Sequence, residues 1–169
     1  MTRIIFFSFI TLLTSCASNQ SPFDTTDGQL LNSETAVFSA INERHLGQVS
    51  SAEIVSVDGE LTKGNGGPMW VRVSPKSHSF EIKAKWDEYS GFDQASNWSG
   101  HTEATVMVNI PEMKARHVYL AKYKITKTKI YVTFEDLGKD PYFGFKLSSF
   151  GKRNGSNATF YPVSFEDEE

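Results

Sequence analysis

The sequence predicts an all-β fold, an antiparallel β-sandwich, with a small β-barrel as the alternative. Several segments alternate apolar and polar residues with a period of two, which is typical of half-buried strands. Glycine and proline fall between those segments, so that about seven to nine short strands follow one another at regular spacing. No internal repeat or heptad is visible.

Composition indicates how such a fold is stabilised. The 169 residues include 13 Phe, 6 Tyr and 3 Trp, and these large side chains supply the bulk of a core. The chain has 1 Cys and therefore no internal disulfide, so the domain depends on packing. Its net charge of −3 argues against a nucleic-acid partner.

The first predicted strands lie between residues 35 and 58. Residues 35–41 favour a strand, and a short helix running towards Gly47 is the alternative. Residues 49–58 form a stronger strand that ends at Asp58-Gly59, a dipeptide that tolerates the positive φ of a tight turn. The three glycines and the proline of residues 63–68 predict a loop.

The clearest predicted hairpin joins residues 69–74 to residues 79–86 through Pro75-Lys76-Ser77. In its second strand apolar side chains face one way and charged ones the other: Phe80, Ile82, Ala84 and Trp86 against Glu81, Lys83 and Lys85. In its first strand one face carries Met69, Val71 and Val73.

Two further hairpins are predicted in the second half of the chain, after a strand at residues 102–110 whose inward side chains are Ala104, Val106, Val108 and Ile110. Residues 117–125 and 129–135 form one hairpin, with Ile130, Val132 and Phe134 inward and a break at residues 136–141. Residues 142–150 and 159–165 form a looser one, in which Pro162 favours an edge strand.

The N-terminus has the organisation of a signal peptide. Arg3 precedes an apolar run over residues 4–13, which is followed by the small residues Thr14 and Ser15 and then by Cys16. A membrane-spanning helix needs about 20 apolar residues. The run is shorter than that and has the length of a signal-peptide core.

Leu13-Thr14-Ser15-Cys16 resembles the lipobox of bacterial lipoproteins. The resemblance implies cleavage before Cys16, acylation of its sulfur and anchoring in the cell envelope. Ala17 implies an outer-membrane protein facing the periplasm. An ordinary secretory signal with an incidental cysteine is the alternative. The expected organisation is a signal peptide (1–15), a lipidated cysteine with a flexible polar tether (16–34), a β-sandwich (35–165) and a frayed acidic tail (166–169).

The central span, residues 36–137, carries a second resemblance. Ser56 to Glu60, Val71 to Ile82 and Ala115 to Tyr119 are similar to a pattern in small bacterial lipoproteins with an immunoglobulin-like or PEGA-like sandwich, mostly of unassigned function. Lys76 and Arg116 stand where glycine is common in that pattern. The resemblance implies an immunoglobulin-like or PEGA-like fold and gives no information about an activity.

No catalytic, metal-binding or cofactor-binding motif is visible. The four histidines (His45, His78, His101 and His117) are not spaced as metal ligands, and no G-x-S-x-G elbow is present. Asp58, Asp136 and Asp140 fall in predicted turns, where carboxylates cap backbone amides. Residues 64–67 lack the Lys-Ser/Thr of a phosphate loop. We therefore expect no enzyme, no cofactor and no metal.

Two surfaces are candidate binding sites. One is the polar loop that carries Tyr89, Phe92 and Trp98, which suits a glycan or a protein unless the rings fold back to plug the sandwich. The other is a basic face that suits anionic headgroups, unless it is an ordinary charged surface that discourages edge pairing. It comprises Lys114, Arg116, Lys122, Lys124, Lys127 and Lys129.

These observations predict a non-enzymatic envelope lipoprotein. It would be held at the membrane by Cys16 and would act as an accessory subunit or binding module for an envelope protein or a glycan. The alternative is a periplasmic carbohydrate-binding or hydrolytic protein that uses the Tyr89–Trp98 loop.

Overall fold

A computed structural model describes residues 21–41, 49–62, 67–87, 101–126, 129–148 and 158–167. Within these ranges the chain forms strands and one short 3₁₀ helix, η1 (Asn32–Glu34). The strands are β1 (Phe23–Asp24), β2 (Ala36–Ser39), β3 (Ser51–Val57), β4 (Glu60–Leu61), β5 (Trp70–Val73), β6 (His78–Asp87), β7 (His101–Ile110), β8 (His117–Ile125), β9 (Ile130–Lys139), β10 (Gly144–Ser148) and β11 (Ala158–Pro162). The predicted all-β, sandwich-like fold is confirmed, and the sheets do not close into a barrel.

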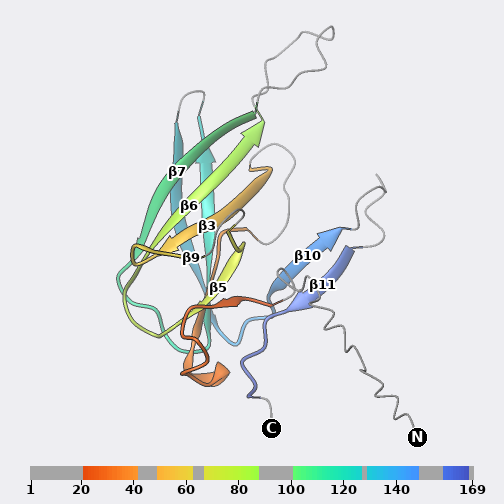
Figure 1. Cartoon of the computed structure of the whole chain (residues 1–169). Coiled ribbons are helices and arrows are strands. Elements are labelled where there is room, and N and C mark those ends of the chain that lie inside the picture. The colour runs from red at the N-terminus through yellow and green to blue at the C-terminus, as the bar shows by residue number, and fades with distance from the viewer. Residues whose placement is uncertain are drawn as a thin grey trace, which may run out of the picture.

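Two sheets face each other (Figure 1). The five-stranded sheet has the order β1-β5-β2-β8-β9 and is mixed, because β1 runs parallel to β5 and β2 runs parallel to β8. The four-stranded sheet has the order β4-β3-β6-β7 and is antiparallel throughout. Strands β10 and β11 form a separate antiparallel pair, which confirms the last predicted hairpin.

The four-stranded sheet follows the predicted alternation. In β6, Phe80, Ile82, Ala84 and Trp86 are buried, and the charged residues between them are partly exposed. Asp58 and Gly59 have φ angles of 53° and 85°, so β3 and β4 are joined by the two-residue turn in which both central residues adopt positive φ. The turn predicted at this dipeptide is confirmed.

The hairpin predicted between residues 69–74 and 79–86 is wrong. Strand β5 pairs with β1 and β2, whereas β6 pairs with β3 and β7, so residues 74–77 cross from one sheet to the other. All four residues of β5 are buried, including Arg72. The short alternating pattern of residues 69–74 therefore belongs to a strand covered on both faces, and it does not indicate which neighbour the strand pairs with.

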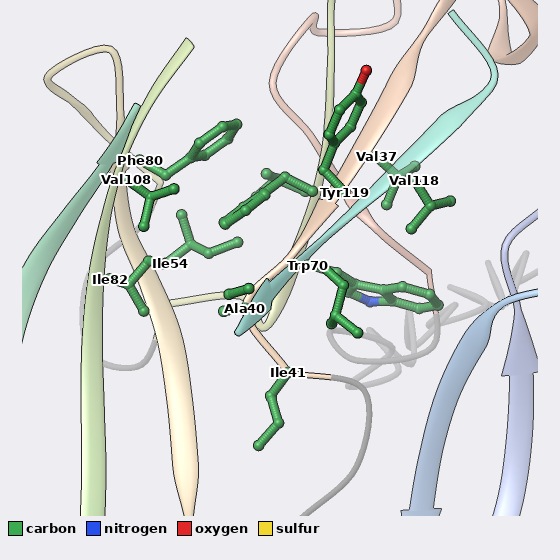
Figure 2. Packing of buried hydrophobic residues seen from close by; sticks show 14 of the residues in the cluster. Val37, Ala40, Ile41, Ile54, Trp70, Phe80, Ile82, Val108, Val118 and Tyr119 are labelled. Atoms are coloured by element: carbon green, nitrogen blue, oxygen red, sulfur yellow. The ribbon is translucent and has the colours of Figure 1, made fainter. Parts of the chain in front are cut away.

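The core between the two sheets is built around an aromatic pair. Phe38 of β2 stacks on Phe80 of β6, with ring centroids 4.0 Å apart. Figure 2 shows Phe80, Ile54, Ile82 and Val108 of the four-stranded sheet gathered on one side of this core. These side chains are buried, as expected for the inward face of each strand.

A third layer covers the outer face of the five-stranded sheet. Trp70 points away from Phe80 and towards β10 and β11 (Figure 2), and its ring lies 5.9 Å from that of Phe145. Val37 and Val118 point the same way and are fully buried. The β10–β11 pair and the C-terminal segment thus act as a lid that gives this sheet a second hydrophobic interface.

Strand β9 differs from the prediction in two respects. The β8–β9 hairpin is confirmed, but β9 continues to Lys139 through a bulge opposite His117 and Tyr119, where Gly138 has a φ of 88°. Phe134, predicted to point inward, is 37% exposed, because β9 is the end strand of its sheet and Phe134 packs only obliquely against Tyr119.

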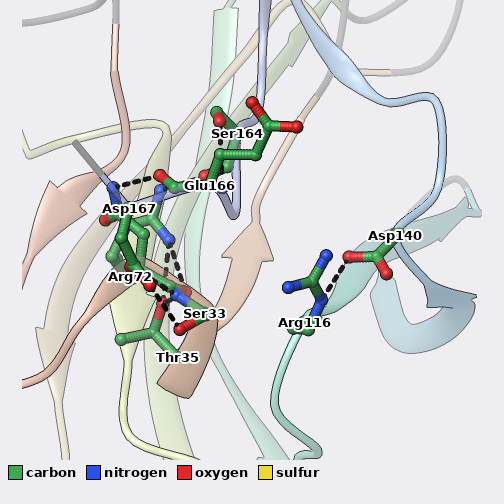
Figure 3. A network of polar contacts seen from close by, with 9 residues as sticks. Ser33, Thr35, Arg72, Arg116, Asp140, Ser164, Glu166 and Asp167 are labelled. Carbon is green, nitrogen blue, oxygen red and sulfur yellow. Dashed lines mark hydrogen bonds and ion pairs between the residues drawn. The ribbon is translucent and has the colours of Figure 1, made fainter. Parts of the chain in front are cut away.

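The predicted boundaries of the domain are also corrected. Residues 23–34, expected to be part of the tether, are folded: β1 pairs with β5, and Asn32 Nδ2 donates a hydrogen bond of 3.1 Å to the Glu166 carbonyl. The Ser33 hydroxyl donates to Asp167 at 2.7 Å. Figure 3 shows this contact beside Arg72, so residues 166–167 are fastened to the N-terminal segment and are not frayed.

Candidate functional site

A groove of about 540 Å³ lies between the N-terminal segment and the β3–β4 turn. Its walls include β1 and β4, which are the end strands of the two sheets on one side of the sandwich. The residues lining it are Phe23, Asp24, Thr25, Thr26, Asp27, Gln29, Leu30, Val57, Asp58, Glu60, Leu61, Thr62, Ser74, Lys76 and His78. The floor combines polar and apolar groups in the way that recognition sites do.

A buried histidine joins the two sheets beneath this groove. His78 opens β6, and its Nδ1 lies 2.8 Å from Asp58 Oδ2 in the β3–β4 turn. Its Nε2 lies 2.8 Å from the carbonyl oxygen of Ser74, which follows β5, and 3.4 Å from the Ser74 hydroxyl. The side chain is only 4% exposed, so packing as well as hydrogen bonds fixes its position.

Ser74, His78 and Asp58 are the residue types of a nucleophilic triad, but their geometry does not suit one. In a triad Nε2 accepts the proton of the serine hydroxyl, which requires a free lone pair on that nitrogen. Here the carbonyl oxygen, which only accepts hydrogen bonds, lies closer to Nε2 than the hydroxyl does. Nε2 therefore carries its proton as a donor, and His78 fastens two loops together.

Asp58 is held as an anion. Burial raises the pKa of its carboxyl, but the hydrogen bonds from the Ser79 amide and from His78, together with the positive charges of His78 and Lys76, outweigh burial, so that the pKa lies below the ordinary 3.8. The Ser79 amide donates to Oδ1 at 2.9 Å. Both carboxylate oxygens are thus occupied by the protein itself.

Of the three remaining carboxylates of the groove, one accepts hydrogen bonds from the protein, and two have no partner among the described residues. Asp24 accepts hydrogen bonds from the Thr26 amide, the Thr26 hydroxyl and the Gly28 amide. Asp27 and Glu60 are exposed, and neither has a hydrogen-bond or ion-pair partner among the described residues. Beside them Leu61 is 76% exposed. The groove therefore offers free negative charge next to an apolar side chain.

The structure divides the predicted basic face. Lys122 and Lys124 lie exposed on one face of β8, opposite Thr133 and Tyr131 of β9, and exposed Lys129 directly precedes β9. Lys114 and Arg116 lie at the other end of β8, beyond His117. Lys127 lies outside the described residues.

Two of the basic residues have acidic partners. Lys122 pairs with Glu135 at 2.7 Å, and Arg116 pairs with Asp140 at 2.7 Å. Arg116 has a φ of 66°, a left-handed backbone conformation that glycine adopts more readily than other residues. The charges of these two residues are therefore compensated locally, and the described residues of the predicted basic face are divided between the two ends of β8.

Several predicted sites lie outside the described residues, namely Cys16, Tyr89, Phe92 and Trp98. They stay predictions. The described part of the chain holds no group of three or more His, Cys, Asp or Glu side chains placed to bind a metal ion. It also holds no helix with the length and hydrophobicity to cross a membrane.

Sequence reasoning missed the groove because residues 23–34 read as tether. The missed signal lies in Phe23-Asp24-Thr25-Thr26-Asp27-Gly28, where an apolar residue leads into a turn-forming sequence. Asp24 caps that turn, and Asp27 and Gly28 both have positive φ.

Comparison of the chain with protein-family models, with curated proteins and with solved structures finds no match.

Proposed function

We propose that this chain is an envelope lipoprotein, anchored through Cys16, whose β domain binds a protein partner without catalysing a reaction. The observation that carries the binding role is the groove between β1 and β4. It presents exposed Leu61 and the free carboxylates of Asp27 and Glu60, while its one histidine is occupied on both ring nitrogens. Such a site can recognise a ligand through its carboxylates and its apolar side chain, and its histidine is already engaged with the protein itself.

The lipid anchor on Cys16 would lie only a few residues before the folded domain. Phe23 is seven residues after Cys16 in the sequence and is already paired with β5. Seven residues span at most about 25 Å when fully extended. Two or three acyl chains on the cysteine would anchor the protein stably. The domain would then sit close to the bilayer, with the groove wall formed by residues 23–30 nearest to the anchor.

Lipidation is tested by expressing wild-type protein and Cys16→Ser in a Gram-negative host. We expect wild type to lose residues 1–15, to gain acyl mass on Cys16 and to fractionate with membranes. Cys16→Ser should stay uncleaved and unacylated. Mass spectrometry of the intact proteins gives the answer, and a wild-type protein with an unmodified Cys16 and intact residues 1–15 would refute the anchor.

The binding role is tested by site-specific photocrosslinking in intact envelopes. A photoreactive residue at Leu61 reports on the groove, and one at Met107 is the control, because Met107 is 55% exposed on the four-stranded sheet and lies outside the groove lining. We expect a discrete crosslinked protein from position 61 and none from position 107. Equal crosslinking from both positions, or none from position 61, would contradict a partner in the groove.

A further inference from the structure

We infer that the groove takes an extended, lysine- or arginine-rich peptide segment of the partner, laid along the open edge of β4. This inference rests on the proposed function, since it assigns the chemistry of the partner at the same site. Three features of the groove carry it: the edge of β4, which pairs with no further strand among the described residues, the free carboxylates and the exposed leucine.

The edge of β4 has backbone groups that are available for pairing. Val57 and Glu60 flank the two-residue turn and form its closing pair, so the next pair, Ser56 and Leu61, does not exchange hydrogen bonds. The amide and carbonyl of Leu61 therefore point away from β3. The chain then turns inward at Thr62, whose amide and hydroxyl donate to Val55 and Ile54 carbonyls. An extended peptide can pair with such an edge through its main chain.

The charge of the groove selects a basic peptide. Four carboxylates line it, those of Asp24, Asp27, Asp58 and Glu60, and its basic side chains are Lys76 and the buried His78, which already contacts Asp58. Asp27 and Glu60 lie on opposite walls, one in the N-terminal segment and one in β4, and both are free to accept a charged donor. Complementary charge of this kind steers a cationic segment into the groove and rejects an acidic one.

The apolar residues set the pattern of the peptide. Side chains of an extended peptide alternate between two sides. If the basic side chains point at the carboxylates, every second side chain points to the opposite side of the peptide. Leu61 is 76% exposed, and Phe23 and Leu30 also line the groove. We therefore expect alternation of basic residues with β-branched residues such as valine and threonine in the bound segment.

The test measures fluorescence anisotropy of a labelled Lys-Thr-Lys-Val-Lys-Thr-Lys-Val peptide with the full mature chain in detergent micelles. The peptide with glutamate in place of each lysine is the control ligand. We expect saturable binding of the basic peptide only, weakened as salt rises. The double variant Asp27→Asn with Glu60→Gln should weaken binding about five- to tenfold. Asparagine tolerates the positive φ of Asp27, so the turn is retained.

The matched control is Glu103→Gln with Glu112→Gln, which removes the same charge from exposed sites outside the groove and should change affinity less than about twofold. Leu61→Pro removes the outward amide and should weaken binding. Leu61→Ala keeps that amide and removes only the apolar side chain, so it measures the apolar contact separately from main-chain pairing, also where the proline variant misfolds. Equal weakening by both double variants, or binding of the acidic peptide, would overturn the inference. Crosslinking at Leu61 without binding of the basic peptide would reject this peptide class and leave the proposed function standing.

Discussion

Strands β5 and β6 follow one another along the chain, yet they are buried in different ways. Strand β6 buries every second residue and leaves the charged ones at the surface, whereas β5 buries all of Trp70, Val71, Arg72 and Val73. The difference shows that the four-stranded sheet has one hydrophobic interface and the five-stranded sheet has two. The second interface is made by segments from the end of the chain, β10, β11 and the residues after them.

The second interface requires a charged residue to be buried. Arg72 Nη1 donates to the Thr35 hydroxyl at 2.8 Å and Nη2 donates to the Ser164 carbonyl at 2.9 Å, while the guanidinium lies 5.5 Å from the centre of the Phe165 ring. Burial lowers the pKa of Arg72, although Asp24 and Asp167 oppose this. The guanidinium thus connects both ends of the folded domain, as Figure 3 shows.

The largest expected effect tests whether the outer faces of the two sheets differ. Trp70→Ala removes a side chain that is 1% exposed beneath Phe145, and we expect it to lower the free energy of unfolding by about 3–5 kcal/mol. Met107→Ala changes the outer face of the four-stranded sheet, where the side chain is 55% exposed, and should cost less than about 0.5 kcal/mol. Urea denaturation of the full chain measures both. Similar losses for the two variants would mean that the β10–β11 layer adds no stability.

The comparison also explains which parts of the fold could be predicted from sequence. Strand β6, the Asp58-Gly59 turn and the β8–β9 hairpin were predictable because each depends on local patterning or on residues that adopt positive φ. The crossing from β5 to β6 was not, because a strand buried on both faces has no polar side to orient it. Its Met-Trp-Val-Arg-Val-Ser pattern suggests alternation, yet Arg72 is buried by groups that lie far away in the sequence.

The candidate site was less predictable than the fold for the same reason. Asp58 was correctly placed in a turn, but its pairing with His78 depends on β3 and β6 being neighbours. The groove depends on residues 23–30 folding back against the β3–β4 turn. A polar composition predicts a tether there, and two residues of strand, Phe23 and Asp24, are too short to give a periodic signal.

The second-largest expected effect tests the contribution of the buried Arg72 guanidinium to stability. Arg72→Ala leaves the Ser164 carbonyl without its donor and removes the packing of the aliphatic stem, so we expect a loss of about 2–3 kcal/mol in the free energy of unfolding. Lys83→Ala is the control on β6, because its ion pair with Glu103 is at the surface and should contribute less than about 0.5 kcal/mol. A loss at Lys83 as large as that at Arg72 would show that burial of the guanidinium is not what matters.

The smallest effect tests the contact between the β3–β4 turn and the start of β6, and it has a defined pH dependence. Asp58→Asn keeps a side chain that tolerates a φ of 53° but removes the charge that faces His78. Because the folded-state pKa of Asp58 is lowered below 3.8, the carboxylate stabilises the fold at any pH above that value. Its contribution is lost as the pH falls through the lower folded-state value. We expect a loss of about 1 kcal/mol near neutral pH, kept small because the carboxylate is 42% exposed.

The pH dependence separates charge from turn geometry. Urea midpoints of wild type and Asp58→Asn should differ at about pH 6 and converge as the pH falls through the folded-state pKa of Asp58, which lies below 3.8, since both side chains are neutral below that pKa. Glu60→Gln is the matched control in the same hairpin, because Glu60 has no partner among the described residues and should leave the midpoint unchanged at both pH values. A gap for Asp58→Asn that persists in acid would assign the loss to the backbone of the turn, and the ionic contact between the β3–β4 turn and β6 would then contribute nothing.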